Sequence, residues 1–171
     1  MGWWIKGYKN VIGLFTKEGF RLETKMRYLI DTNIWLERLL DQEKSETVSL
    51  FLDQVPLENV FVSDFTIHSI GVILSRSKKF DILSDFLKDL FSNAQIEQFS
   101  LSPGELMHVI SNMQEFNLDF DDAYQLSVSQ KYDLVIVTFD KDFNAKGIQK
   151  ITPEEFINRT GSIDQDFEIP Y

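Results

Sequence analysis

Residues 27–35 read Arg-Tyr-Leu-Ile-Asp-Thr-Asn-Ile-Trp, a short apolar run that ends on a carboxylate and two small polar residues. This pattern is typical of a buried strand that delivers an acid, Asp31, to the edge of a sheet. In open α/β sheets, ligands gather outside the carboxyl ends of the strands. We therefore expect Asp31 to lie at a functional site.

The composition indicates a single soluble domain. The chain has 171 residues, of which 43% are hydrophobic, enough for one core and too few for two ordinary domains. Since no apolar run approaches the roughly 18 residues of a membrane span, we expect a cytoplasmic protein with no membrane contact. The chain has no cysteine, which excludes disulfides, thiolate metal sites and cysteine nucleophiles. His68 and His108 are the only histidines, which disfavours a zinc site.

The charge is unevenly distributed along the chain. Residues 1–25 carry five Lys or Arg against two Asp or Glu, whereas the whole chain has a net charge of −10. An acidic body disfavours broad electrostatic binding of nucleic acid, but it permits a nuclease whose acids are neutralised by bound cations. Carboxylates without cysteine favour a hard cation such as Mg²⁺ or Mn²⁺.

The hydrophobic periodicity predicts strands that alternate with helices. Strands are expected at residues 28–30, 59–63, 96–101, 134–138 and 148–151, and helices at residues 34–40, 48–55, 65–74, 80–91, 102–116, from about 118, and 152–159. Two of the helices open with capping boxes, Ser102-Pro-Gly-Glu105 and Thr152-Pro-Glu-Glu155. This alternation predicts an α/β fold with a mainly parallel sheet.

The same pattern divides the chain into three parts. Residues 26–160 form the predicted domain, and residues 161–171 form an acidic tail that we expect to be poorly ordered. Residues 1–25 are basic and form an extension that the fold does not need. A docking arm for a partner and an additional strand remain alternatives for this extension.

Three acids stand out by their position. Asp31 follows the first strand, Asp122 lies at a helix start, and Asp140 follows the most apolar strand. Strand ends and helix starts meet at one face of such a sheet, where the mutual repulsion of the carboxylates requires raised pKa values or a cation. Two or three carboxylates with waters suit the octahedral shell of Mg²⁺, which can assist phosphodiester cleavage. Each acid taken alone is equally compatible with a helix cap or a solvated charge.

Three short motifs resemble, in the correct order, those of the PIN domain family, and the closest subgroup is the VapC-type ribonuclease toxins. They are Leu29-Ile-Asp-Thr-Asn33, the pair Asp122-Ala123, and Val137-Thr-Phe-Asp-Lys-Asp-Phe143. The resemblance spans about residues 26–156. It implies a three-layer α/β/α sandwich with five mostly parallel strands. It also implies a Mg²⁺- or Mn²⁺-dependent endoribonuclease, often a homodimer, with a small antitoxin as the partner of the toxin subgroup.

The resemblance also assigns roles to individual residues. Asp31, Asp122 and Asp140 correspond to the catalytic, metal-binding acids, and Asp142 is a further candidate. Asn33 and Thr138 correspond to supporting polar groups that orient acids or waters. Asp121 adds charge beside Asp122, although adjacent helix residues point about 100° apart.

One position departs from the family pattern. The family usually places a glutamate in the helix after the second strand, within Ser-x-x-Thr-x-x-Glu, and this chain has Ser69 there, after Ser63 and Thr66. A serine hydroxyl can hold a metal-bound water but brings no charge. His68 and Asp64 are possible local substitutes, although structural roles are the more ordinary explanation for both.

Two alternatives to an active ribonuclease follow from these residues. The first is a catalytically impaired PIN fold that acts as a binding or interaction module, because Ser69 replaces the expected acid. The second is a receiver-like or phosphohydrolase domain with Asp31 as a nucleophile. The second is disfavoured because Asp31-Thr-Asn lacks the second acid of an Asp-x-Asp motif and no lysine closes a later strand.

Overall fold

The fold is that of a computed structural model, which describes residues 26–145 and 147–163. The strands are β1 (Tyr28–Ile30), β2 (Val60–Ser63), β3 (Glu97–Phe99), β4 (Val135–Val137) and β5 (Lys150–Ile151). The α-helices are α1 (Thr32–Leu39), α2 (Ser45–Gln54), α3 (Asp64–Arg76), α4 (Phe80–Lys88), α5 (Leu106–Phe116), α6 (Phe120–Tyr132) and α7 (Pro153–Ile163). None of these helices is long and apolar enough to cross a membrane. The predicted basic extension and most of the predicted tail lie outside the described residues.

The five strands form one sheet in the order β3-β2-β1-β4-β5, and all four pairings are parallel. The predicted α/β class with a parallel sheet is therefore confirmed. The central strand is β1, where Leu29 aligns with Phe61 of β2 on one side and Ile136 of β4 on the other. The ladder continues past β1, since the Asp31 N–H donates to the Val137 carbonyl at 3.1 Å. The carboxyl ends of β1 and β4 are thereby fixed side by side.

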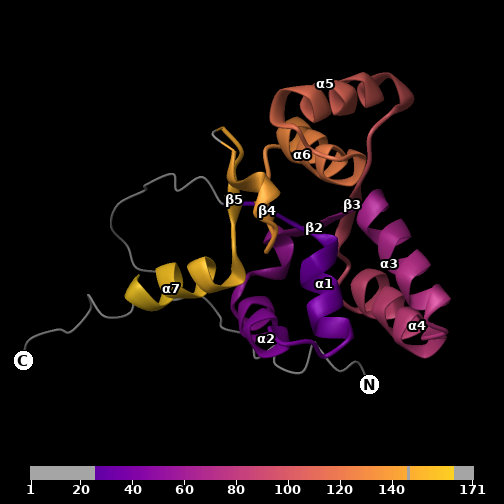
Figure 1. Cartoon of the computed structure of the whole chain (residues 1–171). Coiled ribbons are helices and arrows are strands. Elements are labelled where there is room, and N and C mark those ends of the chain that lie inside the picture. The colour runs from indigo at the N-terminus through magenta and orange to yellow at the C-terminus, as the bar shows by residue number, and fades with distance from the viewer. Residues whose placement is uncertain (1–25, 146, 164–171) are drawn as a thin grey trace, which may run out of the picture.

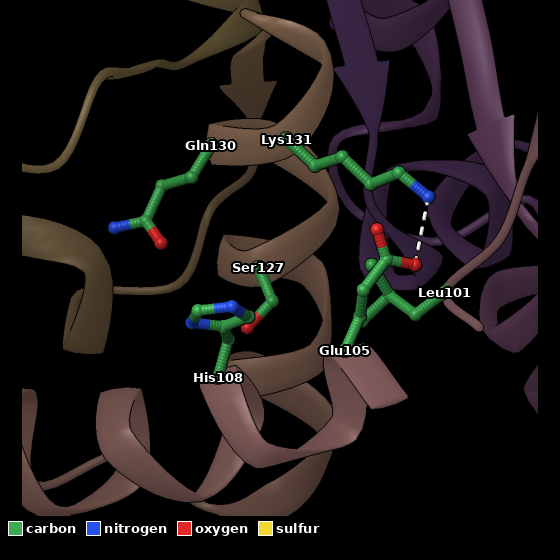
Figure 2. A pocket seen from close by; sticks show the side chains of 6 residues that line it. All are labelled: Leu101, Glu105, His108, Ser127, Gln130 and Lys131. Atoms are coloured by element: carbon green, nitrogen blue, oxygen red, sulfur yellow. Dashed lines mark hydrogen bonds and ion pairs between the residues drawn. The ribbon is translucent and has the colours of Figure 1, made fainter. Parts of the chain in front are cut away.

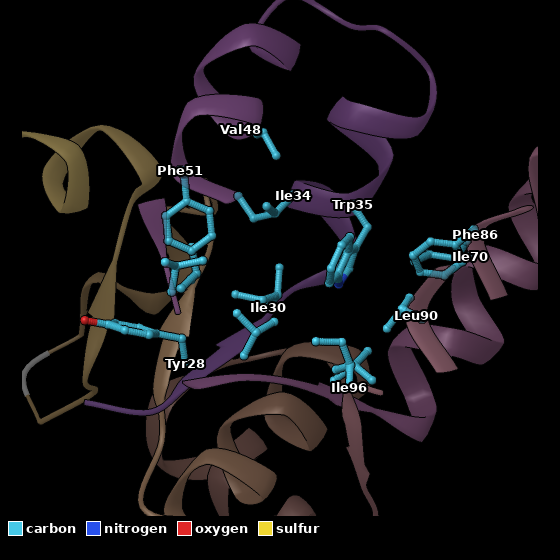
Figure 3. Close-up of a cluster of buried hydrophobic side chains, with 14 of the residues drawn as sticks. Tyr28, Ile30, Ile34, Trp35, Val48, Phe51, Ile70, Phe86, Leu90 and Ile96 are labelled. Atoms are coloured by element: carbon cyan, nitrogen blue, oxygen red, sulfur yellow. The ribbon is translucent and has the colours of Figure 1, made fainter. Parts of the chain in front are cut away.

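Helices cover both faces of the sheet and complete three layers (Figure 1). Successive residues of β1 point to opposite faces. Tyr28 and Ile30 pack in one core with side chains from α1, α2, α3, α4 and α7, many of which are drawn in Figure 3. Leu29 packs in a second core, with side chains from α5 and α6. The three inner strands β1, β2 and β4 are consequently buried on both sides, as the apolar runs of the sequence predict, whereas β3 is exposed at Glu97 and Gln98.

The helix boundaries show where the sequence prediction succeeds and where it does not. Both capping boxes are present: the Ser102 N–H donates to Glu105 at 2.7 Å, and the Thr152 N–H donates to Glu155 at 2.8 Å. The last helix, however, continues to Ile163, beyond the predicted end of the domain at residue 160. The helix predicted over residues 80–91 is α-helical only to Lys88, and a π-helical turn, Asp89–Asn93, follows it.

Candidate functional site

A cavity of about 270 Å³ lies where β1 and β4 end and α6 begins. Of the residues that the sequence predicts for a site, six line this acid cavity: Asp31, Asn33, Ser69, Asp121, Asp122 and Asp140. Its remaining wall is formed by Thr32, Leu36, Phe65, Ile73, Asp119 and Gln125. Residues from the beginning, the middle and the end of the domain therefore meet at one place.

Asp31 is buried, with 6% of its surface exposed, and both of its carboxylate oxygens accept hydrogen bonds. Oδ1 accepts from the Thr32 N–H at 2.6 Å, which caps α1, and Oδ2 accepts from Asn33 and Thr138 at 2.8 Å each. Burial raises the pKa of Asp31 to about 6, although the hydrogen bonds from Thr138 and Thr32 oppose this shift. Asp31 is thus held firmly in place in a setting that disfavours its charge.

Thr138 and Asn33 connect the ends of β1 and β4. The buried Thr138 hydroxyl donates to Asp31 and accepts from the Asp140 N–H at 2.9 Å. The Asn33 side chain donates to Thr138 Oγ1 at 2.8 Å and accepts from the Phe139 N–H at 3.3 Å. Both residues therefore orient the acids on either side of them, although Thr138 does not itself line the cavity.

Asp122 lies in the first turn of α6, and Asp119 is the N-cap of that helix. The Asp119 carboxylate accepts from the Asp122 N–H at 2.9 Å, which brings the two acids together. Burial raises the pKa of Asp122 to about 7, and the negative charges of Asp119, Asp140, Asp31 and Asp142 add to the shift. This part of the cavity therefore concentrates negative charge, and no basic residue is among those that line it.

Three carboxylates come within reach of a common ion. One oxygen from each of Asp122, Asp140 and Asp142 lies within 4.8 Å of the others. The Asp142 N–H also donates to Asp140 Oδ1 at 2.8 Å, which fixes their relative orientation. Asp31 lies in the same cavity but outside this group. Hard oxygen donors with unrelieved charge fit a divalent cation such as Mg²⁺ or Mn²⁺.

The position of the expected glutamate holds no charge. Ser69 lines the cavity from α3, and neither His68 nor Asp64 is among the lining residues. His68 is exposed, with its ring 6.3 Å from that of Phe65. Asp64 Oδ1 accepts from the Phe65 N–H at 2.9 Å and from the Tyr124 hydroxyl at 2.8 Å. Asp64 is therefore engaged outside the cavity, whereas the charge of His68 acts on Asp121, which lines the cavity.

Two further polar residues of the cavity wall, Asp119 and Gln125, lie outside the motifs of the sequence. The three-residue spacing from Asp119 to Asp122 is that of an N-cap and its N3 position. Gln125 lies three residues after Asp122 and therefore on the same side of α6. Their helical spacing from Asp122 is the feature of the sequence that identifies both residues as neighbours of Asp122.

A second cavity, of about 310 Å³, lies between α5 and α6 and is lined by Leu101, Glu105, His108, Ser127, Gln130 and Lys131 (Figure 2). Here the acid is neutralised, because Lys131 Nζ lies 2.8 Å from Glu105. The hydrogen bonds from Lys131 and Ser102 lower the pKa of Glu105 to about 2. His108 is exposed at this cavity and does not line the acid cavity.

Three solved structures share this fold. A toxin–antitoxin complex from Klebsiella pneumoniae is 24% identical, covers 74% of this chain and 97% of its own, and has a TM-score of 0.60. FitAcB from Neisseria gonorrhoeae is 23% identical, with coverages of 74% and 98% and a TM-score of 0.59. VapC20 from Mycobacterium tuberculosis, described as a sarcin-ricin loop cleaving toxin, is 17% identical, with coverages of 71% and 95% and a TM-score of 0.62.

The family comparison agrees with the fold. None of the curated proteins is a significant match to the chain. The sequence model of the PIN domain, in contrast, matches residues 28–148, which include all four motif acids, Asp31, Asp122, Asp140 and Asp142. This match does not support the receiver-like alternative. By its sequence and its fold, this chain belongs to the PIN domain family.

Proposed function

We propose that this protein is a Mg²⁺- or Mn²⁺-dependent endoribonuclease and the toxin of a toxin–antitoxin pair. The observation that carries the proposal is the acid cavity at the ends of β1 and β4. Asp31, Asp122 and Asp140 line this cavity, and oxygens of Asp122 and Asp140 lie within 4.8 Å of one another and of an oxygen of the adjacent, exposed Asp142. A cation is the physical means of keeping so many carboxylates ionised at neutral pH.

In this proposal some side chains bind the cation and others orient the acids that bind it. Asp122, Asp140 and Asp142 would hold the cation, with Asp31 in the same cavity as a further ligand. A bound divalent cation supplies Lewis-acid stabilisation of the phosphodiester and lowers the pKa of a water. Thr138 and Asn33 keep Asp31 in position through their hydrogen bonds to its Oδ2. Asp119 and Asp121 extend the negative rim and strengthen attraction for the cation.

Membership of the PIN family and the likeness to toxins support the choice of RNA as substrate and of a small antitoxin as partner. We place the protein in the cytoplasm, where both are found. A homodimer is supported by apolar side chains that α5 exposes, Met107 at 64% and Ile110 at 46%. Residues 26–160 form the catalytic domain in this proposal, and α7 extends it to Ile163.

Cleavage of RNA by the purified full chain in the presence of Mn²⁺ tests the proposal. Asp31→Asn and Asp140→Asn are each expected to reduce the rate to background, because each removes a charge from the cavity. Asp81→Asn is the matched control, since Asp81 is an exposed acid in the first turn of α4. Cleavage that persists in both cavity variants would refute the assignment.

A second function is favoured by one observation, the uncharged Ser69 in the cavity wall. On this alternative the chain is a catalytically impaired PIN fold that retains binding to a partner. Titration calorimetry with Mg²⁺ and Mn²⁺ separates the two functions. A ribonuclease requires a binding isotherm that Asp140→Asn abolishes, whereas the interaction module requires none at physiological ion concentrations.

A further inference from the structure

Gln125 is a buried polar side chain at the acid cavity that no role assigned above explains. It lies three residues after Asp122 on α6, so that the two side chains emerge on the same side of the helix. Only 2% of its surface is exposed, yet it lines the cavity together with Asp31 and Ser69. Gln125 is therefore part of the cavity wall where α6 meets α3.

The amide of Gln125 is satisfied at one end only. Its Nε2 donates to Thr66 Oγ1 on α3, and its buried Oε1 has no hydrogen-bond partner within the described part of the chain. Thr66 is itself fixed, because its N–H donates to Ser63 Oγ at 2.9 Å. If the amide oxygen and nitrogen exchanged places, the buried nitrogen instead of the oxygen would lack a hydrogen-bond partner. An unsatisfied buried group of this kind points to a water or an ion that completes it.

We propose that the Gln125 carbonyl oxygen accepts a hydrogen bond from a water of the cation's hydration shell, with the Ser69 hydroxyl as a second anchor for that water. This inference rests on the proposed function, since it needs a divalent cation in the cavity. Gln125 is then a positioning residue, because it acts on the ion through the water. Mg²⁺ and Mn²⁺ sites suit such an arrangement, since Mg²⁺ characteristically retains several waters when protein carboxylates bind it.

The contacts of the neighbouring side chains favour this neutral pair over a charged substitute. Asp64 accepts hydrogen bonds from Tyr124 and from its own helix terminus, and the exposed His68 acts on Asp121 without lining the cavity itself. Ser69 and Gln125, in contrast, come from two different helices and both line the cavity. The hydrogen bond from Gln125 to Thr66 ties those helices together and fixes the direction of the amide.

Mn²⁺ binding to the full chain tests the inference, measured by titration calorimetry and by the electron paramagnetic resonance spectrum of bound Mn²⁺. Gln125→Leu is expected to weaken binding by about 10- to 100-fold, the range for residues that orient a metal's ligands. The metal-free melting temperature should change little, because the substitution removes both the unpartnered Oε1 and the hydrogen bond from Nε2 to Thr66. Gln125→Glu should tighten binding, since it adds a negative charge, and it provides a test even if the leucine variant folds poorly.

Asn112→Leu is the matched control. Asn112 is a buried amide on α5 that is satisfied, since its Nδ2 donates to Ser127 at 2.8 Å and to Gln130 at 3.0 Å. This variant is expected to lower the melting temperature and to leave Mn²⁺ affinity unchanged. The different effects of the two leucine variants on Mn²⁺ affinity and on melting temperature distinguish a residue that supports ion binding from one that stabilises the fold.

The outcomes separate failure of this inference from failure of the proposed function. If wild-type protein binds Mn²⁺ through Asp140 and both Gln125 variants bind it equally well, the role of Gln125 is wrong and the nuclease proposal stands. A Gln125→Leu variant that melts earlier with unchanged Mn²⁺ affinity would likewise reduce the amide to a structural contact. If the wild-type protein binds no Mn²⁺, both proposals fall together.

Discussion

The two cavities at opposite ends of α6 are similar in size and opposite in electrostatics. The acid cavity, at the N-terminal end, encloses about 270 Å³, and the second cavity encloses about 310 Å³. In the acid cavity, burial raises the pKa of Asp122 to about 7. In the second cavity, the hydrogen bonds to Lys131 and Ser102 lower the pKa of Glu105 to about 2.

The difference lies in whether the acids of a cavity find a basic partner among the residues that line it. Glu105 finds its counter-charge inside the protein, so its site is electrostatically balanced. Asp122 faces further carboxylates instead, and the hydrogen bonds at Asp31 hold an acid in place where burial opposes its charge. Groups whose pKa values are strongly perturbed by burial and by like charges are typical of functional sites. Size alone would not have distinguished the two cavities.

The largest effect that this comparison predicts is on catalysis. Asp122→Asn is expected to lower the rate of Mn²⁺-dependent RNA cleavage by about 100-fold or more, because catalysis by a bound ion depends on its ligands. Glu105→Gln is the matched change in the second cavity and should leave the rate unchanged. Initial rates on one RNA substrate measure both. Equal losses in the two variants would show that the cavities do not differ in function.

Thr138→Val tests how the acid cavity is held together. The substitution removes the buried hydroxyl that bonds both Asp31 and the Asp140 N–H, and we expect a loss of about 1–3 kcal/mol in the free energy of unfolding. Ser102→Ala removes a helix cap beside the second cavity and should be milder, at about 1 kcal/mol. Urea denaturation of the metal-free proteins gives both values. If Thr138→Val leaves the free energy of unfolding unchanged, the hydroxyl does not orient Asp31.

The pH dependence of stability should have opposite signs in the two cavities, because the pKa values of Asp31 and Asp122 are raised whereas the pKa of Glu105 is lowered. Asp31 and Asp122 have pKa values of about 6 and about 7 in the folded protein, above the ordinary value of 3.8, so the folded state binds more protons between these limits. These raised pKa values stabilise the folded state of the metal-free protein. The stabilisation is complete below pH 3.8 and is lost as the pH rises through about 7. The melting temperature of metal-free protein should therefore fall between pH 5 and pH 8, and less so in Asp31→Asn/Asp122→Asn. A rise in wild-type protein over this range would contradict the assignment.

The smallest effect is expected at the ion pair of the second cavity. Glu105 and Lys131 are partly exposed, and exposed ion pairs contribute little to stability. Lys131→Met should lower the melting temperature slightly at low salt, and the difference from wild type should shrink in high salt as screening weakens the pair. A large decrease that salt does not change would show that Lys131 acts through packing rather than through charge.

The elements that carry strong local signals could be predicted from the sequence. The apolar run before Asp31 and the β-branched run before Thr138 give neighbouring parallel strands, β1 and β4, because both are buried on two faces. The two capping boxes fix the starts of their helices through reciprocal hydrogen bonds that a four-residue pattern specifies. The meeting of Asp31, Asp122 and Asp140 at one cavity follows from that topology.

What the sequence could not supply depends on contacts between distant segments. The grouping of Asp142 with Asp122 and Asp140 arises from a turn in which the Asp142 N–H bonds Asp140. The importance of Gln125 is visible only once Thr66 is placed opposite it and its oxygen is found without a partner. The extension of α7 to Ile163 was missed because Gly161 reads as a helix terminator in sequence.

The central place of β1 in the sheet has a consequence for a chain that is still being made. Translation delivers Asp31 early, but its partner Thr138 follows 107 residues later. Until β4 has left the ribosome and paired with β1, Asp31 has neither Thr138 nor Asp140 beside it. Contacts of such large sequence separation form late in folding. A nascent chain that stops before β4 therefore cannot assemble the acid cavity, so any activity of this site begins only after residues 135–137 have been synthesised and paired with β1.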